Sequence, residues 1–213
     1  MRTLECDADI EAAVTNLITV EPRFAAVIAI HGHPPLRRMN AGLEGLLRIV
    51  TDQLISLQAG AAIWRRIETK LAPFDAGTIA RKREATLMKL GLSGAKARSF
   101  KAVASAVADG RLDFPALAKL SDTDVLTALT KLKGIGPWTA DIFLLSAMGR
   151  TDAWPAGDLA LQAAAQNLFS LAARPSDKDL AQMAEPWKPW RGVAARLLWS
   201  HYRGLKGMSQ TVG

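Results

Sequence analysis

Residues 122–148 place two apolar helical segments on either side of a tight turn at residues 134–137, which reads Gly-Ile-Gly-Pro. Glycine adopts the positive φ and allows the close backbone approach that a short turn needs, and proline is favoured in the first turn of a helix. The stretch therefore predicts a helical hairpin whose first helix ends near Leu132 and whose second begins at Pro137. Ile135 is expected to pack back against both helices and fix the angle between them.

The start of the second helix of this hairpin offers a surface for an anion. The N–H groups of a first helical turn have no partner inside the helix, and after a tight turn they point outward, where a phosphate oxygen can accept from them. Lys131 and Lys133 add positive charge beside the turn. The pattern favours an anion site, and an ordinary helical corner with a glycine cap remains the alternative.

The rest of the chain also has the apolar spacing of helices. Apolar residues at three- and four-residue steps predict a helix over about 42–59: Leu43, Leu46, Leu47, Val50, Leu54 and Leu57. Ser121 and Ser176, each followed by acidic residues, are typical helix N-caps. Alanine is abundant and alternating β-branched residues are rare, so strands have little support. With 49% hydrophobic residues and short connections, the chain is predicted to be all-α.

The cysteine and histidine content excludes several classes of metal site. Cys6 is the one cysteine in 213 residues, so neither an intramolecular disulfide nor a four-cysteine zinc or iron–sulfur site can form. Three histidines are too few for a histidine-based metal site without carboxylate help. No apolar run approaches the roughly 18 residues of a membrane span, and the acidic N-terminus lacks the apolar stretch of a signal peptide. We therefore expect a cytoplasmic protein with no membrane partner.

Positive charge is concentrated in one part of the chain. The 27 Lys and Arg residues exceed the 20 Asp and Glu residues, which gives a formal net charge of +7. Residues 78–101 hold seven basic side chains and one acid, whereas residues 1–21 hold five acids and one Arg. A basic stripe is the usual footprint of a polyanion such as DNA, but a solvated helix face has the same composition. Charge alone does not decide between the two.

An aspartate follows the hairpin after a loop rich in proline and glycine. Residues 152–158 read Asp-Ala-Trp-Pro-Ala-Gly-Asp, and an apolar helical run over residues 159–169 comes directly after them. Asp158 is therefore expected at or next to a helix N-terminus, where the helix dipole and the free amides favour a carboxylate. Taken alone, the pattern indicates a helix N-cap worth about 1 kcal/mol.

Taken together, these motifs resemble a known family. LKGIGPWTA at residues 132–140 resembles the helix–hairpin–helix motif, which binds the DNA backbone without reading base sequence. A hairpin followed by a Gly/Pro loop and an aspartate about twenty residues later resembles the DNA glycosylase superfamily named for these elements (HhH-GPD). The resemblance implies two tightly packed helical subdomains with the active-site cleft between them: one over about 42–125, the other discontinuous, over about 1–41 plus 126–213. It also implies that Asp158 is the catalytic carboxylate, which stabilises positive charge on the deoxyribose as the N-glycosidic bond breaks and helps position the water.

Two absences and several matches indicate the branch of the family. A single cysteine cannot supply the iron–sulfur cluster of the endonuclease III-like members, and Trp138 stands where bifunctional members have their Schiff-base lysine. Residues 21–36, 52–56, 91–100 and 187–191 resemble the alkylpurine branch, the bacterial 3-methyladenine DNA glycosylase II and its fungal relatives. The resemblance implies a monofunctional, monomeric hydrolase without lyase activity. It would flip alkylated purines such as 3-methyladenine out of duplex DNA and release them in base excision repair, near the nucleoid of a prokaryote or in the nucleus of a eukaryote.

The same resemblance assigns roles to residues around the extruded base. Leu54 would be the apolar wedge that enters the duplex, with Gln53 beside it, and a core position on an amphipathic helix is the alternative for Leu54. Trp138 and Trp199 would form aromatic walls of the base pocket, because an electron-rich indole attracts a cationic alkylpurine. Packing in the core is the alternative for each of these tryptophans taken alone.

The hairpin would hold the DNA backbone and, as in related hairpins, a monovalent cation. The residues expected at the backbone are Lys133, Gly134, Gly136 and Thr139. The carbonyls of Thr130, Lys133 and Ile135 would bind a structural sodium or potassium ion, and no other cofactor is expected.

Two positions depart from the branch and leave the range of lesions open. Ile142 stands where the branch often has an aromatic residue, and Gly157 stands where it often has an acidic or polar one. Asp141 would be a compensating polar group or an exposed helix acid. A glycosylase for hypoxanthine or ethenoadenine, and a non-catalytic helix–hairpin–helix DNA-binding module, remain the alternative functions.

Overall fold

The computed structural model describes residues 2–207, and their regular structure is helical. It contains thirteen α-helices within this range, together with one isolated bridge between Thr3 and Arg150. The prediction of an all-α fold is therefore confirmed. None of the described helices is long and apolar enough to cross a membrane. The chain folds into two compact units, called here unit 1 (Met1–Arg38 with Gly149–Gly213) and unit 2 (Met39–Met148).

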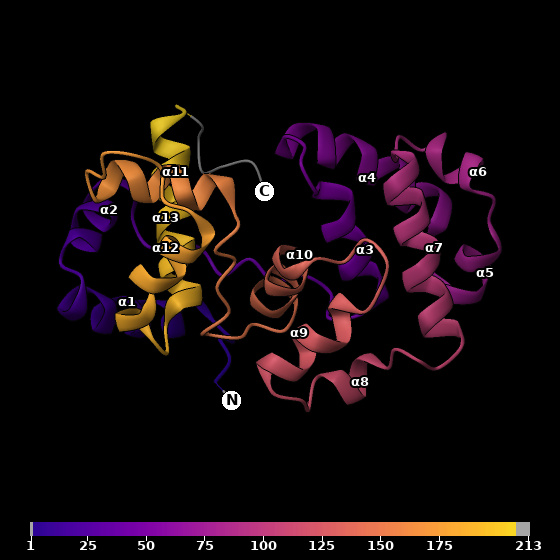
Figure 1. The fold of residues 1–213 in the computed structure, drawn as a ribbon, viewed down its shortest axis with the longest axis horizontal. Helices are drawn as coiled ribbons and strands as arrows, with labels where there is room; N and C mark the ends of the chain where they lie inside the picture. The colour runs from indigo at the N-terminus through magenta and orange to yellow at the C-terminus, as the bar shows by residue number, and fades with distance from the viewer. Residues whose placement is uncertain (1, 208–213) are drawn as a thin grey trace. The chain divides into compact units, whose positions relative to one another are not determined.

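Unit 2 is built around α7 (Gly94–Ala108), which packs against α3 (Leu43–Asp52), α5 (Ala76–Arg81) and α6 (Glu84–Met88) (Figure 1). Phe100 and Val103 of α7 are fully buried in this core. The other elements of the unit are α4 (Leu57–Leu71), α8 (Phe114–Leu117), α9 (Asp122–Thr130), α10 (Pro137–Ile142) and the π-helical turn η1 (Phe143–Ala147).

Unit 1 is built around α13 (Arg191–Leu205), which packs against α1 (Asp7–Val20), α2 (Arg23–His31) and α11 (Leu159–Leu168) (Figure 1). All seven residues of α13 from Gly192 to Leu198 are buried. The remaining elements are α12 (Asp177–Met183) and the 3₁₀ turn η2 (Glu185–Trp187). The two predicted serine caps are confirmed, because Ser121 and Ser176 accept from the backbone N–H groups of Asp124 and Asp179.

The prediction of one helix over about 42–59 is wrong. α3 ends at Asp52 and α4 begins at Leu57, and Ser56 caps α4 by accepting from the N–H of Ala59. Leu54 and Leu57 continue the three- and four-residue spacing across the break, but neither lies on a buried helix face. Leu57, which continued the pattern, is 64% exposed, and the buried face of α4 is formed instead by Gly60, Trp64, Ile67 and Leu71.

The units also differ from the subdomain boundaries expected from the sequence. Those boundaries placed residues 126–148 with the discontinuous part of the chain, whereas in the structure they belong to the same unit as residues 39–125. The reason is that α10 and η1 both pack against α3. The N–H of Met39 also donates to the carbonyl of Ser146, which ties the start of unit 2 to its end.

Candidate functional site

The hairpin forms as the sequence predicts, with glycine required at its first position. α9 ends at Thr130 and α10 begins at Pro137, and Ile135 between them is buried, with 4% of its surface exposed. Gly134 has a φ of +82°, and a Cβ on it would overlap the side chain of Ser99 on α7. Both the backbone conformation and the close packing therefore exclude a larger residue at Gly134.

The second glycine of the turn is not required by the fold. Gly136 is the N-cap of α10, with a φ of −94°, and a Cβ added there would meet nothing within 4 Å. The space in front of the N-terminus of α10 is therefore open to an external group. Lys131 and Lys133, which flank the turn, are exposed.

Three carbonyl groups of the turn are the candidate ligands for a monovalent cation. Within the turn, Leu132 donates to the carbonyl of Leu129 and Ile135 to that of Leu132, while Gln53 donates to that of Gly134. None of the hydrogen bonds described for the turn ends on the carbonyl oxygens of Thr130, Lys133 or Ile135. Carbonyl oxygens are ligands that potassium and sodium accept. Elsewhere in residues 2–207, no group of three His, Cys, Asp or Glu side chains could hold a metal ion.

The loop at residues 53–56, called here the wedge loop, presents Leu54 to solvent. Leu54 is 95% exposed and has a φ of 54°, in the left-handed region that costs an ordinary L-residue about 1–2 kcal/mol. An exposed leucine held in a strained conformation gains nothing for the fold, so the alternative of a core position for Leu54 is wrong. The geometry is that of a side chain presented to a partner.

Gln53 connects the wedge loop to the hairpin. Its Nε2 donates to Oγ1 of Thr139 at 2.8 Å and to the carbonyl of Gly134 at 3.2 Å. Thr139 is only 2% exposed, and its hydroxyl serves this connection. The sequence predicted a place for Gln53 beside the wedge, but it did not predict this link to the hairpin.

Two lysines of the basic segment at residues 78–101 are used inside unit 2. Nζ of Lys96 donates to the carbonyl of Thr51 at 2.8 Å, directly before the wedge loop. Burial lowers the pKa of the Lys96 ammonium, and the charge of Asp52 opposes this shift. Nζ of Lys101 donates to the carbonyls of Ala80 and Lys82. These two side chains therefore close helix ends instead of projecting into solvent.

Asp158, in unit 1, is the N-cap of α11, as the sequence predicts. Its Oδ1 accepts from the N–H groups of Ala160 and Leu161, both at 2.9 Å, and from Nε1 of Trp199 at 3.2 Å. Asp158 is half-buried. Three donors on one oxygen fix the orientation of the carboxylate at the start of α11.

The loop that carries Asp158, residues 152–158 and called here the acid loop, is held at both ends. Nε and Nη2 of Arg191 donate to the two carboxylate oxygens of Asp152 at 2.9 and 2.8 Å. Nε2 of Gln162 donates to the carbonyl of Ala156 at 3.1 Å and to Oδ1 of Asp177 at 2.8 Å. Neither support was predicted from the sequence. A signal for Gln162 was its polar side chain in an otherwise apolar run, one helical turn after Asp158.

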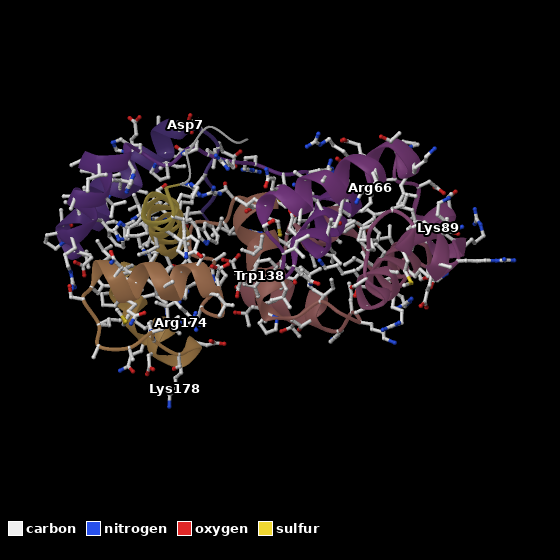
Figure 2. The ribbon with its side chains drawn as sticks, turned by 90° about the horizontal axis from the view of Figure 1, so that it is seen from above. Asp7, Arg66, Lys89, Trp138, Arg174 and Lys178 are labelled. Carbon is white, nitrogen blue, oxygen red and sulfur yellow. The ribbon has the colours of Figure 1, made fainter. Side chains whose placement is uncertain are left out.

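The two tryptophans expected to line a base pocket belong to different units. Trp199 lies on α13 of unit 1, is half-buried, and donates a hydrogen bond from Nε1 to Asp158. A tryptophan that served only to pack the core would not require this hydrogen bond. Trp138 lies on α10 of unit 2 and is half-buried (Figure 2). Asp141 and Ile142 follow it on α10 and are also half-buried. Gly157 of the acid loop is exposed, and a Cβ there would come within 3.3 Å of Oδ2 of Asp177.

Comparisons with known proteins agree with this geometry. The family model described as HhH-GPD superfamily base excision DNA repair protein matches residues 47–189. The chain is 26% identical to the alkylbase DNA glycosidase-like protein mag2 of Schizosaccharomyces pombe, over 91% of this chain and 94% of that protein. It is 30% identical to DNA-3-methyladenine glycosylase 1 of the same organism, over 73% of this chain and 70% of that protein.

A solved structure supports the same assignment. The structure of a 3-methyladenine DNA glycosylase from Schizosaccharomyces pombe in complex with abasic DNA has a TM-score of 0.83 and 26% identity. The match covers 92% of this chain and 97% of that one. Since the family model spans more than half of the sequence and includes both the hairpin and Asp158, the chain belongs to the HhH-GPD superfamily of base excision DNA repair proteins.

Proposed function

We propose that this protein is a monofunctional DNA glycosylase that releases alkylated purines, such as 3-methyladenine, from duplex DNA, and that it acts as a monomer. The observation that carries the proposal is the carboxylate of Asp158, oriented by three donors at the N-terminus of α11. Relatives named as 3-methyladenine glycosylases, which align over most of the chain, support the choice of substrate. Trp138 in place of a Schiff-base lysine supports hydrolysis without lyase activity.

Asp158 would act by opposing the charge of the transition state. As the N-glycosidic bond breaks, its electron pair leaves with the base and positive charge develops on the deoxyribose. A carboxylate already fixed in place stabilises that charge without reorganising. Water then adds to C1′ and loses a proton, which leaves an abasic site. An alkylpurine that carries a positive charge departs as a neutral base, so the carboxylate needs no metal to assist it.

The wedge loop would keep the duplex open while the base is extruded. Flipping a nucleotide costs a few kcal/mol of stacking and pairing, and an apolar side chain inserted into the gap compensates for part of this. Leu54 is exposed, and the side chain of the neighbouring Gln53 is anchored to the hairpin, so Leu54 would be presented to the gap from a fixed loop. Trp138 and Trp199 would stack on the extruded base, and Ile142 would make the pocket aliphatic where an aromatic wall is more usual.

The hairpin would hold the DNA backbone. Phosphate oxygens would accept from N–H groups at the start of α10, including that of Thr139, with Gly136 allowing close approach and Lys133 adding charge. A sodium or potassium ion on the carbonyls of Thr130, Lys133 and Ile135 would supply positive charge next to the phosphate. Backbone contacts of this kind position the protein without reading sequence.

The test is base release by the wild type and by Asp158→Asn across a panel of duplexes that each carry one lesion. Asparagine is as good an N-cap as aspartate, so α11 should keep its start while the negative charge is lost. We expect release of 3-methyladenine to fall by about a thousandfold, with binding to an abasic-site analogue retained. Asp113→Asn is the matched control, since Asp113 caps α8 by accepting from the N–H of Ala116, and it should change release little.

The same panel separates the alternatives. A wild type that binds DNA but releases no base from any duplex would be a non-catalytic binding module, and the proposal would fail. Release confined to hypoxanthine or ethenoadenine would keep the glycosylase chemistry and overturn the substrate. A sedimentation measurement on the free protein checks the monomer, and a dimer at micromolar concentration would contradict it.

A further inference from the structure

Unit 1 contains a small pocket rich in arginine that none of the expected site residues except Trp199 explains. Its volume is about 40 Å³. The lining side chains come from the segment after α2 and from α13, and they are Pro34, Pro35, Arg37, Arg196, Trp199 and Arg203. None of these six residues is acidic.

The spacing on α13 explains why these side chains meet. Arg196, Trp199 and Arg203 are three and then four residues apart, so they lie on one face of the helix. Arg196 lies among the buried residues 192–198 and is only 6% exposed, whereas Trp199 and Arg203 come after them and are half-buried. The prolines at residues 34 and 35 form a wall whose backbone is restricted by the proline rings.

Three of the six lining residues carry a guanidinium group, and their pKa values reflect their surroundings. Burial lowers the pKa of the Arg196 guanidinium to about 10, and the charges of Arg38 and Arg37 contribute to the shift in the same direction. Burial and then Arg37 also lower the pKa of Arg203. With a pKa of about 10, the Arg196 guanidinium keeps its proton at neutral pH. Nη2 of Arg203 donates to Oγ of Ser200, whereas its buried Nε has no hydrogen-bond partner among residues 2–207.

An anion in the pocket would be attracted by the three guanidinium groups that line it. Guanidinium groups bind phosphate oxygens in a bidentate geometry, so several of them around one pocket match a phosphate group. A purine is too large for the pocket, and a cationic alkylpurine would be repelled by it. The chemistry therefore favours an anion of phosphate size.

We propose that the pocket formed by Arg37, Arg196 and Arg203 binds a phosphate of the DNA strand that carries the damaged base. This inference rests on the proposed function for its choice of DNA as the source of the phosphate. Trp199 lines the pocket, and its Nε1 donates to Oδ1 of Asp158. A phosphate bound here would place the adjoining sugar with respect to the carboxylate, so the three arginines are positioning residues for base release.

The test is binding to a duplex that contains a tetrahydrofuran abasic analogue. Single phosphates around the analogue are replaced, one at a time, by an uncharged methylphosphonate. At one of these positions the replacement should weaken binding by the wild type about tenfold. Arg203→Gln should weaken binding to the unmodified duplex by a similar factor, reduce the salt slope by about one, and be insensitive to the methylphosphonate at that position.

Variants are chosen so that misfolding does not imitate the result. Because Arg196 is buried, its replacement endangers the fold, so Arg37→Gln and Arg203→Gln carry the test, since Arg37 is exposed and Arg203 only half-buried. Arg174→Gln is the matched control, with the same loss of charge at an exposed position of unit 1 that does not line the pocket. It should keep the full methylphosphonate effect.

The outcomes distinguish this inference from the proposed function. Equal sensitivity of the wild type and Arg203→Gln at every position would overturn the phosphate pocket. The proposal would also be overturned if no methylphosphonate replacement weakened binding by the wild type while inorganic phosphate bound to the protein. The pocket would then be a site for the free anion and not for a phosphate of DNA. The analogue cannot be cleaved, so these readouts do not depend on activity. A wild type that released no base but showed the position-specific effect would overturn the glycosylase and support the pocket.

Discussion

The wedge loop at residues 53–56 and the acid loop at residues 152–158 are both short connections, but they differ in how they hold the side chain expected to function. The wedge loop leaves Leu54 almost fully exposed, and its anchored side chain is that of the neighbouring Gln53. The acid loop keeps Asp158 half-buried and orients the carboxylate itself, through three donors to one oxygen. A side chain that fills a gap needs only to be presented, whereas a group that opposes developing charge must be oriented in advance.

The largest effect of a substitution is expected at Gly134, whose carbonyl accepts a hydrogen bond from Gln53 of the wedge loop. Gly134→Ala should lower the free energy of unfolding by about 3 kcal/mol, because alanine is strained at a φ of +82° and its Cβ overlaps Ser99. Gly136→Ala should leave stability within about 0.5 kcal/mol and weaken binding to damaged and undamaged DNA alike. Urea unfolding and duplex binding measure both. Equal stability of the two variants would contradict the packing described at Gly134.

For the acid loop, Trp199→Phe removes one donor to Asp158 while keeping an aromatic ring. We expect base release to fall by about tenfold to a hundredfold at saturating DNA, since each of the donors helps fix the carboxylate. Single-turnover kinetics separate this from binding. Trp190→Phe, at the half-buried N-cap of α13, is the control and should retain most of the activity. A loss confined to DNA affinity would argue that the hydrogen bond does not orient Asp158.

For the wedge loop, Leu54→Ala should reduce base release about tenfold and leave stability unchanged, because the side chain buries almost nothing. Leu54→Gly should raise the free energy of unfolding by up to about 1 kcal/mol, since glycine adopts the positive φ without strain. Leu57→Ala, an exposed leucine at the start of α4, is the control for surface hydrophobicity. Destabilisation by Leu54→Ala would show that the wedge loop packs against the protein.

The smallest effect is expected behind the wedge loop, at Lys96. Lys96→Met should lower the free energy of unfolding by about 1 kcal/mol, because the carbonyl of Thr51 loses its donor. The dependence of DNA affinity on salt should stay the same. Lys89→Met, at an exposed position of the same basic segment, should leave stability unchanged. A shallower salt slope for Lys96→Met would mean that this ammonium contacts DNA.

Prediction from the sequence succeeded where local chemistry leaves few choices. The Gly-Ile-Gly-Pro turn requires a hairpin, and Asp158 before an apolar run requires an N-cap, because both depend on neighbouring residues alone. The prediction of one continuous helix failed at Leu54, because the apolar spacing continued across the loop between α3 and α4. Ser56 was the signal of that break, as a capping residue inside a run that otherwise looked continuous.

The sequence by itself determined the all-α fold, the hairpin, the family and the position of the carboxylate. Only the tertiary structure decided that the hairpin belongs with residues 39–125, that Gln53 ties it to the wedge loop, and that Arg37 meets Arg196 and Arg203. The physical reason is the range of the interactions. Caps and turns are set by residues within one helical turn, whereas these contacts join side chains that are far apart along the chain and meet only when the helices pack.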